Sequence, residues 1–204
     1  TLTAGWGSTD NGMRNKPVTQ VELLDPTTAP LLVEDLFAGG DPGPIAAAFA
    51  QVPELALVAL PFLGASLGAG STGARVKELA ILRTSAVLAC RYCVAAHTTV
   101  ALDVGLTDAE VRGLRGEVQW ADEFDDPAEL ALLAWIDEVA GGRGAVSAAV
   151  TEAAKAHFED YELVELTNTI GVTMLLNRFC SALELPVGDD TLARLASGGF
   201  EVEL

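Results

Sequence analysis

Three of the chain's five histidine and cysteine residues fall within eight positions. Residues 90–97 read Cys-Arg-Tyr-Cys-Val-Ala-Ala-His. On a helix, Cys90 and Cys93 are neighbours at i,i+3 and Cys93 and His97 at i,i+4, so all three side chains line one stripe. A Cys-x-x-Cys pair at a helix start has a stabilised thiolate, and an adjacent histidine takes the proton of a nucleophilic thiol. The spacing therefore predicts thiol redox chemistry.

The charged residues around this segment favour the same chemistry. Glu78 is the only acid between residues 75 and 102, a stretch that also holds four of the chain's 12 basic residues: Arg75, Lys77, Arg83 and Arg91. We interpret these bases as a positive island that favours a thiolate, with a solvated helix face as the alternative. On one straight helix, Glu78 lies roughly 18 Å from Cys90 and about 120° round the axis. It joins the cluster only if the chain bends near residues 88–90; an ion pair with Arg75 or Arg83 is the alternative.

Helical patterns that position these residues run through nearly the whole chain after residue 30. A block over 74–105 contains no Pro or Gly until Gly105 stops it, and Thr107 with Glu110 forms a capping box for the next helix. We expect further helices over 31–37, 44–51, 53–68, 126–139, a short one from Ser147, and the longest over 161–185. No alternating strand pattern appears. The sequence predicts an all-α single domain of about eight helices over 31–204, preceded by an N-terminal arm over 1–30 that is disordered or lies along a neighbour.

Composition excludes several classes of protein. Twelve basic against 29 acidic residues give a net charge of −17, which repels phosphates, so no nucleic-acid partner is expected. Residues 55–74 carry no charge, but Pro61, Gly64, Gly68 and Gly70 interrupt them, so we expect a buried core helix and no membrane partner. Three cysteines and the absence of an apolar leader favour a cytoplasmic location. The 50% hydrophobic content leaves a surplus for a homo-oligomer interface.

Glu78, Cys90-x-x-Cys93 and His97 together resemble the alkylhydroperoxidase D-like (AhpD-like) branch of the carboxymuconolactone decarboxylase superfamily. The resemblance covers roughly residues 45–186, and the run over 177–179 is similar to that family's second signature. It implies an AhpD-like all-helical fold, homo-oligomers, and thiol-dependent reduction of hydroperoxides. The reductant it implies is an external dithiol, lipoyl-type or thioredoxin-like. We expect no cofactor and no metal.

The resemblance also implies a role for each residue of the pattern. Cys93 is the thiol that attacks the peroxide and becomes a sulfenic acid. Cys90 is the proton donor and resolving partner that closes the disulfide. His97 and Glu78 form the proton relay.

Tyr92 departs from the family, in which better-studied members carry a histidine between the cysteines. Tyrosine donates a hydrogen bond but is a poor base near neutral pH, so the relay is simplified or the activity towards peroxide is lowered. Tyr92, Asn177 and Arg178 are candidate pocket residues, and Cys180 is interpreted as a packing residue in an apolar helix. We expect oxidation to give a Cys90–Cys93 disulfide with Cys180 free, because only that pair has the spacing for a local bridge.

Other functions fit parts of the pattern. A dithiol–disulfide oxidoreductase without peroxide specificity needs the same cysteines. A carboxymuconolactone decarboxylase-like lyase does not need the cysteine pair, so the pair disfavours it. A zinc site would use Cys90, Cys93 and His97 with Glu78 as fourth ligand, although such sites are uncommon on one uninterrupted helix. A non-catalytic helical oligomer would bury the cysteines as inert core residues.

Overall fold

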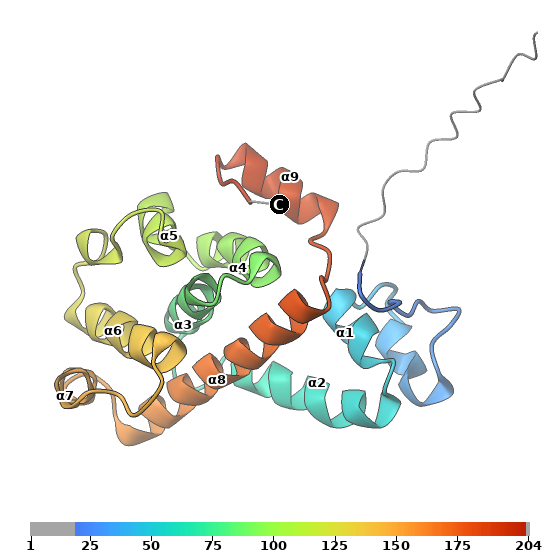
Figure 1. Cartoon of the computed structure of the whole chain (residues 1–204), viewed down its shortest axis with the longest axis horizontal. Coiled ribbons are helices and arrows are strands. Elements are labelled where there is room, and N and C mark those ends of the chain that lie inside the picture. The colour runs from blue at the N-terminus through green and yellow to red at the C-terminus, as the bar shows by residue number, and fades with distance from the viewer. Residues whose placement is uncertain (1–18, 203–204) are drawn as a thin grey trace, which may run out of the picture.

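The computed structural model describes residues 19–202, which form nine α-helices and two short 3₁₀ helices and contain no β-strand (Figure 1). The prediction of an all-α fold is therefore confirmed. In chain order the elements are η1 (Leu31–Phe37), α1 (Pro44–Phe49), α2 (Pro53–Leu67), α3 (Ala74–Val87), α4 (Arg91–Asp103), α5 (Asp108–Arg115), η2 (Trp120–Asp122), α6 (Pro127–Gly141), α7 (Ala148–Lys155), α8 (Asp160–Ala182) and α9 (Asp189–Ser197).

The longest helix, α8, runs diagonally through the molecule and contacts both of its halves (Figure 1). Its first half packs with α3, α4 and α6 around a core that includes Leu166 and Ile170. Its second half packs with η1, α1 and α2 around a smaller core that includes Val172 and Leu176. Packing on several sides explains why the apolar pattern of this helix broadens to nearly all faces, and the central position inferred from that pattern is confirmed.

The main departure from the expected elements is a break in the 74–105 block. The first helix of the block ends at Val87, and Ala89 adopts a left-handed backbone with φ of 51°. A second helix, α4, then begins at Arg91 and packs back against α3. The bend near residues 88–90 that Glu78 requires is therefore present, although no proline or glycine marks it.

Two further elements were not expected from the sequence. The short helix α9 follows Gly188 and begins with two aspartates, and it packs against α4 through the buried Leu195. The 3₁₀ turn η2 lies within an acid-rich stretch that reads as a loop. Both are too short for their periodicity to stand out from the neighbouring turns.

Residues 19–30 lie along the chain's own helices. The backbone N–H of Gln20 donates to the carbonyl of Leu183 at 3.0 Å, and the Gln51 side chain donates to the carbonyl of Glu22 at 2.8 Å. This part of the expected arm is therefore laid against the domain. Residues 1–18 lie outside the described residues, so the prediction for them stays a prediction.

The uncharged stretch over 55–74 forms α2 and the turn after it, with Pro61 inside the helix. Leu63 and Ser66 are buried against the rest of the molecule, while Val58 and Phe62 are exposed. Within residues 19–202, no helix combines the length and the apolar character needed to cross a membrane.

A buried lysine ties α3 to both α2 and α8. Lys77 Nζ donates to the Ser66 carbonyl at 3.1 Å and to Thr169 Oγ1 at 2.9 Å, and it forms an ion pair with Glu165 at 2.7 Å. The backbone N–H of Ser71 also donates to Glu165, at 2.9 Å. The hydrogen bond from Lys77, and then those from Ser71, lower the pKa of Glu165 from 4.5 to about 2.

We expect Glu165→Gln to lower the free energy of unfolding at pH 7 by about 1 to 3 kcal/mol, because it removes a charge-assisted partner of a buried lysine. Since the folded pKa of Glu165 lies below its unfolded value, the stabilisation is complete above the unfolded pKa of 4.5 and is lost as the pH falls toward 2. Urea denaturation at several pH values should therefore show the two proteins converging in acid. Glu152→Gln, on an exposed position of α7, is the control; a constant difference across this pH range would contradict the assignment.

Candidate functional site

The site is built on the turn between α3 and α4. The backbone N–H of Cys90 donates to the Ser85 carbonyl at 3.0 Å, and the Cys90 carbonyl accepts the first hydrogen bond of α4, from Val94, at 2.9 Å. Cys90 is thus the N-cap residue of α4, with an extended backbone (φ −84°, ψ 98°). This is the helix-start position that the Cys-x-x-Cys prediction required, where unpaired N–H groups and the helix dipole favour a negative charge.

Three thiols, not two, meet at this turn. Cys90, Cys93 and Cys180 are all free, and they are 0%, 4% and 1% exposed in one small core cluster. Cys180 packs with both other cysteines in this cluster. Cys180 is buried, as the packing interpretation expects, and it also lies beside the pair. A third thiol is therefore part of the site, while the Cys90–Cys93 disulfide with Cys180 free stays a prediction.

The negative charge of this thiol cluster rests on Cys90. Hydrogen bonds from Cys180 and then from Cys93 lower the pKa of the Cys90 thiol well below 9.0, despite its burial. The same bond with Cys90, followed by that with Cys93 and by burial, raises the pKa of Cys180. At Cys93, the hydrogen bond with Cys180 lowers the pKa of the thiol. Three other causes together outweigh this effect and raise the pKa overall: the hydrogen bond with Cys90, burial, and the charge of Cys90. Of the three thiols, Cys90 is therefore the one whose surroundings favour the thiolate.

His97 and Glu78 meet across the two antiparallel helices. His97 Nδ1 lies 2.9 Å from Glu78 Oε2, and the side chains are 24% and 9% exposed. A carboxylate only accepts, so Nδ1–H donates to Glu78, and in the neutral tautomer with this proton Nε2 is an acceptor. The break in the 74–105 block thus brings together two residues that one straight helix would hold apart.

The positive island expected around the cysteines is wrong, because most of its charges are paired elsewhere. Arg75 pairs with Glu110 and Glu129, and Arg83 pairs with Asp137 at 2.6 Å. The alternative ion pair of Glu78 with either arginine is wrong for the same reason. Of the four bases, Arg91 alone has no ion pair within residues 19–202. The Cys90 thiolate is therefore favoured by its neighbouring thiols and the helix start.

Asn177 joins the site from α8, whereas its neighbour Arg178 does not. The Asn177 amide is 1% exposed, donates to Ser85 Oγ at 3.1 Å and contacts the Cys93 thiol, where its hydrogen bond lowers the pKa. Its Oδ1 has no hydrogen-bond partner among the described residues. Arg178 is exposed and lines none of the described cavities. Burial raises the pKa of half-buried Tyr92 to about 12, so this residue stays a hydrogen-bond donor.

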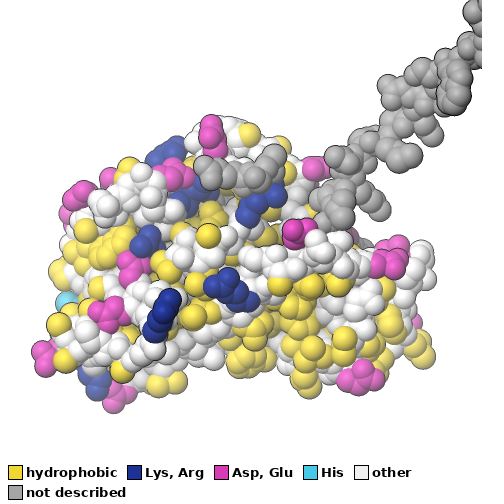
Figure 2. Space-filling view, viewed as in Figure 1, with side chains coloured by type: hydrophobic (Ala, Val, Ile, Leu, Met, Phe, Trp, Pro, Cys, Tyr) yellow, Lys and Arg dark blue, Asp and Glu magenta, His cyan; other side chains and the backbone are white. Residues whose placement is uncertain are grey.

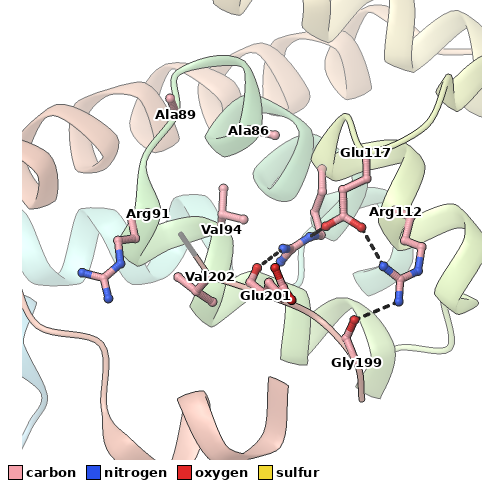
Figure 3. A pocket seen from close by; sticks show the side chains of 10 residues that line it. Ala86, Ala89, Arg91, Val94, Arg112, Glu117, Gly199, Glu201 and Val202 are labelled. Carbon is pink, nitrogen blue, oxygen red and sulfur yellow. Dashed lines mark hydrogen bonds and ion pairs between the residues drawn. The ribbon is translucent and has the colours of Figure 1, made fainter. Parts of the chain in front are cut away.

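Two cavities flank the start of α4, and they share Arg91. The larger, of about 790 Å³, lies beside α5 and the C-terminal segment (Figure 3), and none of the three cysteines lines it. Arg112 in its wall already pairs with Glu117 at 2.7 Å and donates to the Gly199 carbonyl at 3.0 Å. The smaller cavity, of about 450 Å³, is lined by Tyr92 and Cys180. The smaller cavity is therefore the one that reaches the thiol cluster.

The zinc alternative lacks a ligand set in the part of the chain that is described. No group of three or more His, Cys, Asp or Glu side chains within residues 19–202 is arranged to hold a metal ion. Glu78 uses its carboxylate on His97 instead of joining the cysteines.

Solved structures with the same fold carry AhpD-related names. A protein from Ralstonia eutropha JMP134 described as an alkylhydroperoxidase AhpD core, an uncharacterised peroxidase-related protein, superposes with a TM-score of 0.75 at 18% identity, over 86% of this chain and 95% of its own. An uncharacterised peroxidase-related protein from Silicibacter sp. TM1040 superposes with a TM-score of 0.74 at 18% identity, over 88% of this chain and 97% of its own. The debrominase Bmp8 superposes with a TM-score of 0.70 at 18% identity, over 85% of this chain and 95% of its own. No curated protein matches the sequence.

The sequence itself supplies the deciding match. Residues 53–138 match the carboxymuconolactone decarboxylase family, and this stretch contains Glu78, Cys90, Cys93 and His97. The chain therefore carries a carboxymuconolactone decarboxylase family segment over residues 53–138 and shares its fold with the AhpD-named structures. Cys180, which lies outside the matched stretch, could not have been connected to this AhpD-like site by spacing, because α8 approaches the cysteine pair only in the folded chain.

The AhpD-like thiol cluster should hold one thiolate at neutral pH. We expect the reduced protein to show thiolate ultraviolet absorbance at pH 7 that titrates away in acid, with a midpoint well below the usual thiol pKa of 9.0. Cys90→Ser should remove this signal, and Cys180→Ala should raise its midpoint because a donor is lost. Cys93→Ser, which keeps a donor, is the matched control; loss of the signal in that variant alone would place the charge on Cys93.

Proposed function

We propose that the chain reduces hydroperoxides through Cys93 and Cys90, with His97 and Glu78 as a proton relay. The observation that carries this proposal is the placement of a hydrogen-bonded Glu78–His97 pair on the same helices as a thiol pair with a stabilised thiolate. The match of residues 53–138 to the carboxymuconolactone decarboxylase family and the peroxidase-related names of two structural neighbours support it.

In the first step, Cys93 supplies the nucleophile. His97 lies one helical turn after Cys93, and its free Nε2 takes the proton of the Cys93 thiol, whose pKa is raised and therefore requires a base. The thiolate attacks the outer peroxide oxygen, so that an S–O bond forms and the O–O bond breaks. The leaving alkoxide takes the proton from His97 and departs as an alcohol, and Cys93 becomes a sulfenic acid.

In the second step, Cys90 resolves the sulfenic acid. The Cys90 thiolate attacks the Cys93 sulfur, an S–S bond forms, and hydroxide leaves as water after taking one proton. An external dithiol, lipoyl-type or thioredoxin-like, then attacks the Cys93 sulfur and expels Cys90. The lowered pKa of Cys90 makes it the better leaving group of the two. A cytoplasmic setting, as expected from the sequence, would keep such a reductant available.

Dithiol–disulfide exchange without peroxide specificity is the second candidate. It is favoured by Tyr92, which stands where AhpD-like relatives carry a histidine and which gives the relay no additional base. The debrominase Bmp8 has the same fold and a different named activity, so peroxide consumption has to be measured directly. If the chain exchanges disulfides rapidly but consumes no hydroperoxide, exchange is the function.

We expect His97→Asn to lower dithiol-dependent peroxide turnover by about a hundredfold to ten-thousandfold, the usual contribution of a general base. Glu78→Gln should cause a smaller loss, because Glu78 orients the imidazole and does not contact the sulfur. Tyr92→Phe should matter least. His157→Asn changes the chain's other histidine, on an exposed position, and is the matched control. Unchanged turnover in His97→Asn would make His97 a packing residue.

The proposal includes a homo-oligomer, and α2 offers the surface for it. Val58 and Phe62 of this helix are 65% and 52% exposed, and the neighbouring Leu55 and Leu57 are each 48% exposed. Figure 2 shows hydrophobic side chains gathered over the part of the molecule that α2 occupies. Exposed apolar patches of this kind mark association surfaces.

Sedimentation should give a mass above the 21.2 kDa of one chain. Phe62→Lys should shift the protein toward the monomer, because a charge at the centre of an apolar contact is costly to bury. Val164→Lys, at an exposed apolar position on α8, is the control. A single-chain mass for the unsubstituted protein across a wide concentration range would refute association, and an oligomer unaffected by Phe62→Lys would place the interface elsewhere.

A further inference from the structure

We infer that Cys180 is a third redox thiol of this site: it accepts the disulfide from Cys90 and Cys93 and presents it to the external dithiol in the cavity that Cys180 lines. The inference deepens the proposed function and rests on it only for the origin of the disulfide. Any oxidant that joins Cys90 to Cys93 creates the disulfide with which Cys180 exchanges.

The placement of the three sulfurs carries this inference. Cys180 packs in one buried cluster with Cys90 and Cys93. It comes from the last turn of α8, opposite the start of α4, so it approaches the pair from a separate element. Exchange between thiol and disulfide requires only that the attacking sulfur reach the disulfide, and here no helix has to move far for contact.

Access distinguishes Cys180 from its two neighbours. Neither Cys90 nor Cys93 lines any of the described cavities. Cys180 lines the cavity of about 450 Å³ between the start of α4 and the end of α8, together with Tyr92 and the exposed Arg91. This volume falls within the range of small-molecule sites. Although Cys180 is only 1% exposed and Cys93 4%, Cys180 is the one of the three thiols that lines a described cavity, so a dithiol bound in that cavity lies against Cys180.

The exchange balances as a thiol–disulfide reaction. Cys180 loses its proton and attacks the Cys93 sulfur of the Cys90–Cys93 disulfide; a Cys93–Cys180 bond forms, the old bond breaks, and Cys90 leaves as the thiolate. One thiol of the external dithiol then attacks the Cys180 sulfur from the cavity and releases Cys93. The second external thiol displaces Cys180, so that two electrons pass to the protein and the reductant leaves as a disulfide.

The oxidation state of the pair controls when Cys180 reacts. In the reduced protein its pKa is raised first by the hydrogen bond with Cys90 and then by that with Cys93. The first cause depends on the Cys90 thiolate and is lost when Cys90 and Cys93 are joined, whereas the effect of burial remains. Oxidation of the pair therefore lowers the pKa of Cys180 relative to the reduced site and makes its thiol more reactive.

Disulfide mapping tests the contact directly, without peroxide. The reduced chain is oxidised with diamide, remaining thiols are alkylated in acid, and peptides are identified by mass spectrometry. We expect a fraction of the protein to carry Cys180 joined to the segment with Cys90 and Cys93, and Cys90→Ser to form a Cys93–Cys180 bridge in full. Alkylated Cys180 in all oxidised molecules, together with no bridge in Cys90→Ser, would overturn the inference.

The rate of re-reduction tests the role in access. Diamide-oxidised Cys180→Ser should be reduced by dithiothreitol on the order of tenfold more slowly than the unsubstituted protein, because its disulfide stays on the buried pair. Cys180→Ala repeats the test without a buried hydroxyl, and thermal unfolding checks that both variants fold. Ser197→Ala, at an exposed serine of α9 that lines none of the described cavities, is the matched control. Equal re-reduction rates in all four proteins would overturn the role.

The outcomes separate this inference from the proposed function. A Cys180 bridge and slow re-reduction in a chain that consumes no hydroperoxide would reject the peroxidase and keep the third thiol. Peroxide turnover in a chain with no Cys180 bridge would keep the peroxidase and reject the third thiol.

Discussion

The site depends on one backbone constraint, the break between α3 and α4. Because Ala89 takes a left-handed conformation, the chain reverses and α4 starts afresh at Cys90. This reversal creates the helix N-terminus that favours a thiolate. It also turns α3 back along α4, so that Glu78 meets His97. A continuous helix with the same residues would hold the acid far from the histidine and would leave Cys90 inside a helix, with its N–H groups already used.

The thiolate is supported in a way that charge counting along the sequence does not anticipate. Arg75, Lys77 and Arg83 lie near Cys90 in the sequence, yet each pairs with an acid from another helix and stabilises the fold instead. The support comes from the thiols of Cys93 and Cys180, which donate to Cys90 inside a buried cluster. Weak donors suffice there because hydrogen bonds gain strength where water is excluded.

The sequence predicts the helical class, most helix starts and the four residues of the AhpD-like pattern, because capping residues, prolines and i,i+4 spacings are local signals. Thr107 and Pro127 begin their helices as expected. The break at Ala89 carries no local signal, since alanine is the strongest helix former and the reversal is imposed by tertiary packing. Cys180 is missed for a related reason: contact between α8 and α4 is a property of the folded chain, and a single buried cysteine in an apolar helix looks the same with or without neighbours.

The tight enclosure of the three sulfurs also bears on damage by the oxidant. A sulfenic acid is carried on to the irreversible sulfinic and sulfonic acids only if another oxidant molecule arrives before a thiol closes on it. Here two partner thiols already touch each sulfur, and the side chains of Ala48 and Leu185 pack around them. Closure needs no diffusion, whereas a second oxidant has to enter a space that is almost inaccessible to solvent. In the proposed peroxidase cycle, the enclosure that makes the cysteines hard to reach would therefore also protect them from overoxidation.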